Sequence, residues 1–298
     1  MANGMKAWHG VLVATALPFD DDLQVDLDRY AEHIRWLADS GCDGVTPNGS
    51  LGEYQVLMDD ERAAVVRTAV EAAPDGFSVM PGVAAYGAYE ARRWAEHAAE
   101  VGADAVMLLP PNSYRADEET VVAHYAEVAK AGLPIVAYNN PIDTKVDLTP
   151  PLLARLHGEG LIVGVKEFSG DPRRAYEIAE LAPDLEVLIG SDDVVLEVAL
   201  AGAVGWISGY TNAFPETCVD LYRACMAHDL DRALPLYRLM HPLLRWDSKV
   251  QFVQAIKLSM DMVGRYGGPS RPPRQPLTAE QEAAVRRATD NAVAAACR

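Results

Sequence analysis

The sequence predicts an α/β fold of the (β/α)8 TIM-barrel class with a C-terminal helical extension. Three observations lead to this prediction: short apolar runs alternate with amphipathic stretches, the alternation gives eight apolar runs, and these runs cease after residue 212. Strands that alternate with helices require a parallel sheet with right-handed crossovers. Eight such units favour a closed barrel over an open sheet. The 298 residues, 50% of them apolar, suffice for one large core.

The expected strands are short apolar runs, because parallel strands that are buried on both faces consist mainly of consecutive apolar residues. They lie at residues 10–16, 44–46, 78–82, 105–109, 134–138, 161–166, 186–189 and 204–208. The expected helices carry apolar residues at intervals of three and four. They lie near residues 26–40, 59–73, 87–101, 117–131, 149–157, 172–182 and 191–201.

Beyond residue 212 the pattern is helical throughout. Segments near 215–228, 230–246, 249–263 and 278–296 are amphipathic, and four prolines between residues 269 and 276 interrupt the chain before the last of them. We expect the first segment to be the eighth barrel helix. The predicted division is a barrel over residues 1–228 and an extension over residues 229–298. Because no Gly- or Ser-rich linker separates the two, the extension should pack on the barrel.

Composition and charge exclude several classes of function. The net charge is -17 and the pI is near 4.8. The surface is therefore acidic and repels phosphate backbones, so nucleic acid is not expected as a partner. No apolar stretch reaches the roughly 18 residues that a membrane span needs, and residues 1–6 lack the apolar core of an export signal. The four cysteines form no CxxC pair, which argues against a zinc site or a disulfide framework and fits the cytoplasm.

No metal site is expected either. The histidines show no ligand spacing, and the acidic run 20–22 lacks the glycine and terminal glutamate of a calcium loop. A solvated turn explains that run.

Lys166 stands near the end of the apolar run 161–167, which has the sequence LIVGVKE. Burying a lysine without a partner costs several kcal/mol and normally lowers its pKa. A neutral amine can attack a ketone and form a Schiff base. The alternative is a strand-end lysine whose ammonium reaches water, and this segment alone leaves both possibilities open.

Two further segments belong at the same end of the predicted barrel. Tyr138 ends the preceding strand, and adjacent strands lie about 4.8 Å apart, so its phenol could carry the protons that imine formation requires. The turn at 49–53, GSLGE, offers backbone N–H groups that suit a carboxylate. Taken singly, each segment is also explained by an ordinary strand-end tyrosine and by a turn that starts a helix.

Together these segments resemble the N-acetylneuraminate lyase and dihydrodipicolinate synthase superfamily, which consists of class I Schiff-base 2-oxo acid lyases. The resemblance covers nearly the whole chain. It rests on five motifs in order: 49–53 (GSLGE), 138–141 (YNNP), 164–167 (GVKE), 190–193 (GSDD) and 205–208 (GWIS). A single motif would be weak evidence, whereas five with barrel spacing are specific.

The resemblance implies a role for each matching residue. Lys166 would form the imine, Tyr138 would relay protons, and Ser50 would link that phenol to a second tyrosine. The amides near Ser50 and Leu51 would hold the substrate carboxylate, and Ile207 would line the floor near the imine. The resemblance also implies no metal and no cofactor other than the covalent imine on the lysine. It further implies a homotetramer built as two close dimers.

Three positions depart from the family pattern. Leu51, two residues after Gly49 in the substrate-binding turn, replaces a threonine and removes a side-chain donor. The second relay tyrosine aligns with Ser113, so Tyr114, one position away, is the candidate for that role. Asp143 stands where dihydrodipicolinate synthases carry an arginine, and its charge would repel the carboxylate of the aldehyde substrate.

The predicted function is therefore a Schiff-base-forming lyase (aldolase, dehydratase or deaminase). Its substrate would be a small 2-oxo acid or a related cyclic imino acid, such as a 2-keto-3-deoxy sugar acid or a pyrroline-hydroxy-carboxylate. One alternative is 4-hydroxy-tetrahydrodipicolinate (dihydrodipicolinate) synthase, which Leu51 and Asp143 disfavour. The other is a non-catalytic 2-oxo acid sensor, for which the absence of a tyrosine at Ser113 is the only support.

Overall fold

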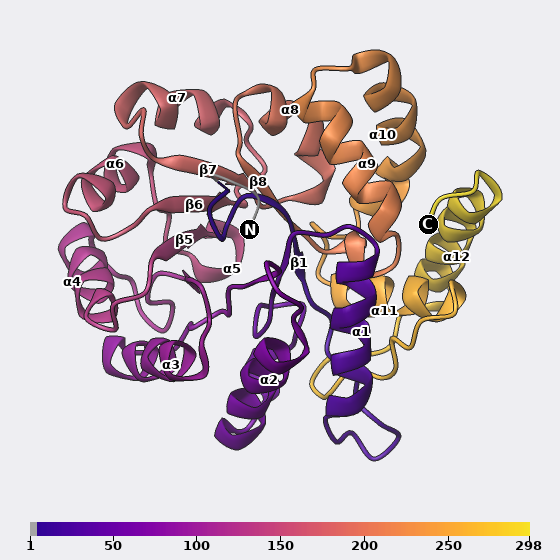
Figure 1. The fold of residues 1–298 in the computed structure, drawn as a ribbon, viewed down its shortest axis with the longest axis horizontal. Coiled ribbons are helices and arrows are strands. Elements are labelled where there is room, and N and C mark those ends of the chain that lie inside the picture. The colour runs from indigo at the N-terminus through magenta and orange to yellow at the C-terminus, as the bar shows by residue number, and fades with distance from the viewer. Residues whose placement is uncertain (1–4) are drawn as a thin grey trace.

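The computed structural model describes residues 5–298, which form a ring of parallel strands surrounded by helices (Figure 1). The first four residues, part of the stretch considered above for an export signal, lie outside the described residues. The strands are β1 (Gly10–Ala14), β2 (Gly44–Thr46), β3 (Ser78–Val79), β4 (Val106–Leu108), β5 (Ile135–Asn139), β6 (Gly164–Glu167), β7 (Glu186–Ile189) and β8 (Gly205–Ser208). The (β/α)8 prediction is confirmed.

The sheet runs in the order β3-β2-β1-β8-β7-β6-β5-β4, and every pairing is parallel. The ring closes between β3 and β4 through a bridge that pairs Gly82 with Met107. There Met107 donates its N–H to Pro81 at 2.9 Å, and Val83 donates to Met107 at 3.0 Å. β3 is shorter than the expected 78–82. Met80 and Gly82 still donate to Val45 and Pro47 at 2.9 and 2.8 Å, but Pro47, directly after β2, has no N–H to donate back to β3.

The barrel helices are α1 (Leu27–Asp39), α2 (Asp59–Ala72), α3 (Ala88–Val101), α4 (Glu118–Ala129), α6 (Pro150–Gly158), α7 (Arg173–Leu181) and α8 (Val195–Leu200). Aspartates cap two of them, with Asp26 accepting from Arg29 N at the start of α1 and Asp117 from Thr120 N at the start of α4. α8 begins later than expected because residues 192–194 form a 3-10 turn. The sequence did not indicate α5 (Pro141–Thr144), a single turn directly after β5.

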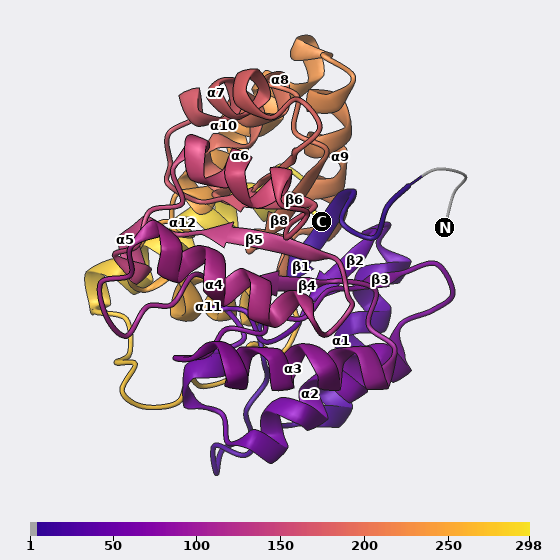
Figure 2. The ribbon, with the colours of Figure 1, turned by 90° about the vertical axis from the view of Figure 1, so that its left-hand side faces the viewer.

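Four helices follow the last strand: α9 (Pro215–Met226), α10 (Leu230–Leu244), α11 (Phe252–Met262) and α12 (Ala279–Ala294). α9 packs against α8, as the eighth barrel helix should, and α10 packs on α9, while α12 covers α10 and α11. Figures 1 and 2 show α12 on the outside of this helical group. The helical extension is thus confirmed, while its division from the barrel at residue 228 stays a prediction.

A buried ion pair ties this extension to the barrel. Lys257 of α11 donates from Nζ to Glu53 Oε1 at 2.9 Å, and both side chains are almost completely buried. The backbone N–H of Arg271 reaches the other oxygen of Glu53 at 3.1 Å, and the Arg271 guanidinium pairs with Glu61. Removing one partner of a buried pair is strongly destabilising, so the segment after α11 is held firmly beside the turn at 49–53.

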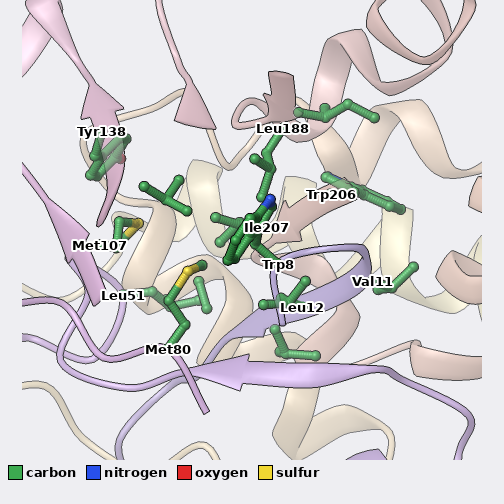
Figure 3. Close-up of a cluster of buried hydrophobic side chains, with 14 of the residues drawn as sticks. Trp8, Val11, Leu12, Leu51, Met80, Met107, Tyr138, Leu188, Trp206 and Ile207 are labelled. Atoms are coloured by element: carbon green, nitrogen blue, oxygen red, sulfur yellow. The ribbon is translucent and has the colours of Figure 1, made fainter. Parts of the chain in front are cut away.

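The interior of the barrel is packed with apolar side chains from the strands. Figure 3 shows Ile207 close to the middle, with Leu12, Leu188 and Met80 around it, and each of these four side chains is at most 1% exposed. Because these side chains fill the interior of the barrel, a substrate can bind only at its open end. Within residues 5–298, no helix combines the length and the apolar character that crossing a bilayer requires.

Candidate active site

A cavity of about 360 Å³ opens at the carboxyl ends of the strands. This is the end where barrels of this class carry their reactive groups. Its lining includes most of the residues singled out from the sequence, namely Gly49, Ser50, Leu51, Tyr138, Asp143, Lys166 and Ile207. The structure therefore brings together segments that are far apart in the chain.

Lys166 lies on β6, opposite Tyr138 of β5 in the ladder register. Its side chain is 5% exposed, and its ammonium lies 4.3 Å from the centre of the Tyr138 ring and 5.7 Å from that of Phe168. Burial lowers the pKa of Lys166 to about 8, although the carboxylates of Asp247 and Asp192 act in the opposite direction. A substantial fraction of the amine is therefore neutral near physiological pH.

The neighbouring side chain Glu167 fixes the end of the strand that carries Lys166. Successive strand residues face opposite sides, and Glu167 accepts from Asn139 Nδ2 at 2.9 Å and from Ser169 N at 2.6 Å. Asn139 in turn accepts from Leu148 N at 2.9 Å. These bonds join the ends of β5 and β6 on the side away from Lys166. They therefore fix the positions of Lys166 and Tyr138 relative to each other.

Tyr138 is 4% exposed and packs edge-on against Phe168, with ring centroids 6.2 Å apart. Its hydroxyl accepts a long hydrogen bond of 3.4 Å from Asn140 Nδ2. Burial raises the pKa of Tyr138 above its ordinary value, and the carboxylate of Asp247 adds to the effect. The phenol thus keeps its proton at neutral pH and can both donate and accept one beside the amine.

Two acidic residues lie near the lysine. Asp192 is completely buried and accepts from Trp206 Nε1 at 2.9 Å and from Tyr210 N at 2.8 Å. Burial raises its pKa to about 6. Asp247 lines the cavity from the turn between α10 and α11 and accepts from Asp192 N at 3.3 Å. Burial, with the adjacent Asp192, raises the pKa of Asp247 well above its usual range.

The turn at 49–53 keeps backbone donors free at the cavity. Within the described residues, the N–H groups of Ser50 and Leu51 donate to no protein acceptor. A carboxylate that lines up with them would satisfy both. The helix predicted near residues 59–73 is α2, which starts at Asp59, and a three-residue 3-10 turn (Tyr54–Val56) separates it from the turn at 49–53. Free amides, rather than a helix dipole, are what this turn offers.

Asp143 is located on α5, the single helical turn after β5. Asn140 caps that turn by accepting from Asp143 N at 3.2 Å, and its amide donates to Asp143 Oδ2 at 2.9 Å. The carboxylate is solvent-exposed at the cavity mouth. Lys145, which is two positions further along, contacts its own turn at Ile142 O instead of the cavity.

The structure does not bring the predicted second relay residue into this group. Tyr114 is 55% exposed and does not line the cavity, whereas Asn112 from the same loop does. Within the described residues, no hydrogen bond joins Ser50 Oγ to Tyr138, whose hydroxyl is bonded to Asn140 instead. A role for Ser50 and Tyr114 in proton transfer stays a prediction.

Sequence reasoning missed three charged residues that line the cavity: Asp247, Lys249 and Arg274. All come from the C-terminal extension. No local pattern marks them, because they reach the cavity only through packing of α10 and α11 and of the segment after α11 against the barrel. The acidic pair GSDD at 190–193 was noted as a family landmark, but its electrostatic link to Lys166 appears only in the structure.

A family model described as the dihydrodipicolinate synthetase family matches residues 7–292. The chain belongs to this family. The resemblance drawn from the motifs is thereby confirmed, and the protein is a lyase of the dihydrodipicolinate synthase family. The match spans both the barrel and most of the C-terminal extension, so the added helices are part of the family architecture.

Named relatives and solved structures agree with this assignment. A 4-hydroxy-tetrahydrodipicolinate synthase from Methanothrix thermoacetophila is 34% identical over 94% of this chain and 95% of its own length. The crystal structure of dihydrodipicolinate synthase from Aquifex aeolicus is 28% identical, with a TM-score of 0.90 over 95% of this chain and 97% of that one. A third match is YagE, a prophage protein of the dihydrodipicolinic acid synthase family from E. coli K12, whose crystal structure is in complex with pyruvate. It is 27% identical to this chain, with a TM-score of 0.87 over 94% of this chain and 96% of that one.

Proposed function

We propose that this family member is a Schiff-base-forming lyase in which Lys166 condenses with a small 2-oxo acid or a related cyclic imino acid. The observation that carries the proposal is the Lys166 amine itself. It is buried at a strand end, has a pKa near 8, and lies against the ring of Tyr138 inside a cavity of substrate size. YagE, a structural neighbour, has been captured with pyruvate.

The proposed reaction begins when the neutral amine of Lys166 attacks the ketone carbon. The new C–N bond forms as the carbonyl oxygen takes up a proton, which the Tyr138 phenol supplies. The nitrogen returns a proton to the Tyr138 phenolate, and the restored phenol then protonates the carbinolamine hydroxyl. The C–O bond breaks, water leaves, and the product is a protonated imine, while the phenolate regains its proton from solvent. The imine draws electrons from the adjacent carbon, which permits aldol cleavage, dehydration or deamination. The reaction needs no metal or other cofactor.

The turn at 49–53 would hold the substrate carboxylate through the free N–H groups of Ser50 and Leu51, beside Gly49. Ile207 would form the floor beneath the imine, where it is 1% exposed. Two donors aimed at a carboxylate in a site shielded from water orient the ketone toward the amine. Leu51 contributes packing here in place of a hydroxyl donor.

The test is to incubate the protein with pyruvate and borohydride and locate the reduced adduct by mass spectrometry. The adduct should lie on the peptide that contains Lys166. Turnover should then be measured over a panel of hydroxylated 2-oxo acids and cyclic imino acids. An adduct on another peptide, or none with any 2-oxo acid, contradicts the mechanism. Trapping without turnover of any substrate would instead indicate a 2-oxo acid sensor.

A second candidate function is 4-hydroxy-tetrahydrodipicolinate synthase, which is the name of the Methanothrix relative. Asp143 at the cavity mouth disfavours it by repelling a second carboxylate. Because the Asp143 carboxylate is solvent-exposed, solvent screens this repulsion, which should cost about 1 kcal/mol or less. The same panel decides the question when pyruvate with aspartate semialdehyde is included. Turnover of the semialdehyde above all other substrates would establish this second function.

A further inference from the structure

We propose that Arg274, on the segment between α11 and α12, binds an anionic group at the far end of the substrate. The cavity would then select 2-oxo acids that carry a carboxylate remote from the imine. This inference rests on the proposed function, because Lys166 is taken to hold the 2-oxo end. It assigns the specificity of the site to a residue outside the barrel strands.

The position of Arg274 supports the proposal. The residue lines the same cavity as Lys166 and Asp143, and its side chain is 20% exposed. Its Nε lies 3.6 Å from Glu53 Oε2, beyond a normal hydrogen bond. Within the described residues, no hydrogen bond occupies its two terminal nitrogens, so the planar fork that binds carboxylates in a bidentate manner is available.

The surroundings hold the Arg274 guanidinium in place before any ligand arrives. Glu53 is completely buried and is fixed by Lys257 at 2.9 Å and by the N–H of Arg271 at 3.1 Å. The guanidinium also lies 5.3 Å from the centre of the Phe252 ring. A cation fixed in advance loses little entropy on binding an anion.

The electrostatics agree with an anion-binding role. Burial lowers the pKa of Arg274, while the carboxylates of Glu53 and Asp143 work against that shift. The guanidinium therefore remains charged but incompletely compensated at the cavity wall. Asp143 lies close enough to influence the Arg274 guanidinium, so a 2-oxo acid with a distal carboxylate for Arg274 and a hydroxyl for Asp143 would satisfy both.

Lys249 is the competing cation on the cavity wall. It is exposed, and its ammonium lies 4.0 Å from the centre of the Trp246 ring. A flexible, hydrated point charge discriminates poorly between ligands. Lys249 therefore serves as the matched control for Arg274, which is half-buried and held by its neighbours.

The experiment compares 2-oxoglutarate with 2-oxopentanoate, acids of equal chain length with and without a distal carboxylate. The apparent affinity of each is measured by borohydride trapping on Lys166. In Arg274→Gln, the preference for 2-oxoglutarate should fall by about 10- to 100-fold, and Arg274→Lys should show a smaller loss. Lys249→Gln should change the preference by no more than about twofold.

Two outcomes would overturn the proposal directly: an unchanged preference for 2-oxoglutarate in Arg274→Gln, or an equal fall of that preference in Lys249→Gln. A third is an equal loss of affinity for both acids in Arg274→Gln, which would show that Arg274 only supports Glu53. If the wild-type protein traps neither acid at Lys166, the proposed function fails separately. Calorimetry with glutarate, which forms no imine, then tests Arg274 directly. Loss of glutarate binding in Arg274→Gln supports the assignment, and equal binding in both proteins rejects it.

Discussion

The protonation state of Lys166 governs the chemistry at the residue scale. Only the neutral amine attacks a ketone, so the rate of pyruvate trapping should rise with pH through a midpoint of about 8 instead of the ordinary lysine value of 10.5. Asp247 raises this pKa, and Asp247→Asn should therefore move the midpoint to lower pH. Stopped-flow trapping across a pH series measures both midpoints.

Asp193 offers a control for this pH profile. It is adjacent to Asp192 in sequence, but its carboxylate bonds to Ser191 and Ser248. Asp193→Asn should leave the midpoint close to that of the wild type. A midpoint near 10.5 in the wild-type protein, or an upward shift in Asp247→Asn, would contradict the electrostatic account of Lys166.

Tyr138 leads to a second prediction at this scale. Tyr138→Phe removes only the hydroxyl and keeps the ring that packs against Lys166 and Phe168. Turnover should fall by about 10²- to 10³-fold while substrate binding changes little, since a positioned proton carrier is lost. Steady-state kinetics on the best substrate of the panel measures the effect. Near-full activity of the variant would rule out the relay role, and an unchanged melting temperature would show that the fold is intact.

The junction between β6 and β7 controls the placement of the lysine at the scale of elements. Gly190 follows β7, and a Cβ added there would lie 2.7 Å from the carbonyl carbon of Glu167 and 3.0 Å from Lys166 Cγ. Gly190→Ala should therefore displace the end of β6, cost about 1–3 kcal/mol of stability, and slow trapping on Lys166. Gly158→Ala is the control, because an added Cβ there meets nothing within 4 Å.

Denaturant unfolding and trapping rates on the two glycine variants check this prediction. Equal stability and equal trapping rates in both variants would show that the end of β6 tolerates the added methyl group. The lysine would then owe its position to side-chain packing against Tyr138 and Phe168 rather than to the strand junction.

Local patterns explain how much of the fold was predictable. Each strand and helix has its own apolar pattern, so all eight strands and the long helices are predicted from the sequence. Pro47 and the 3-10 turn at 192–194 shift the bounds of β3 and α8. Lys166 and Tyr138 were found because strand ends in a barrel face one mouth. Asp247 and Arg274 were not, because their positions depend on long-range packing that no short window of sequence records.

The quaternary structure is the prediction at the scale of the whole molecule. The resemblance to the family implies a homotetramer, and Tyr114, which is exposed on its loop, is the candidate to reach a neighbouring subunit. Light scattering at micromolar concentration should give about four times the 32.3 kDa of one chain. A mass of one chain would contradict the tetramer and would remove the reason to expect a second tyrosine in the relay.

The closure of the barrel between β3 and β4 has a consequence for the motions of the molecule. Elsewhere the strands share continuous ladders, but here a single bridge and a few backbone bonds around Gly82 and Met107 complete the ring. Local opening should begin at this seam, since no continuous ladder holds it closed. Amide hydrogen exchange should therefore be faster at Val83 and Met107 than at Val165 and Val187 in the β6–β7 ladder. Because Met107 also lines the cavity, breathing of the seam would widen the site on the side facing the turn at 49–53, while the strands that carry Tyr138 and Lys166 stay closed.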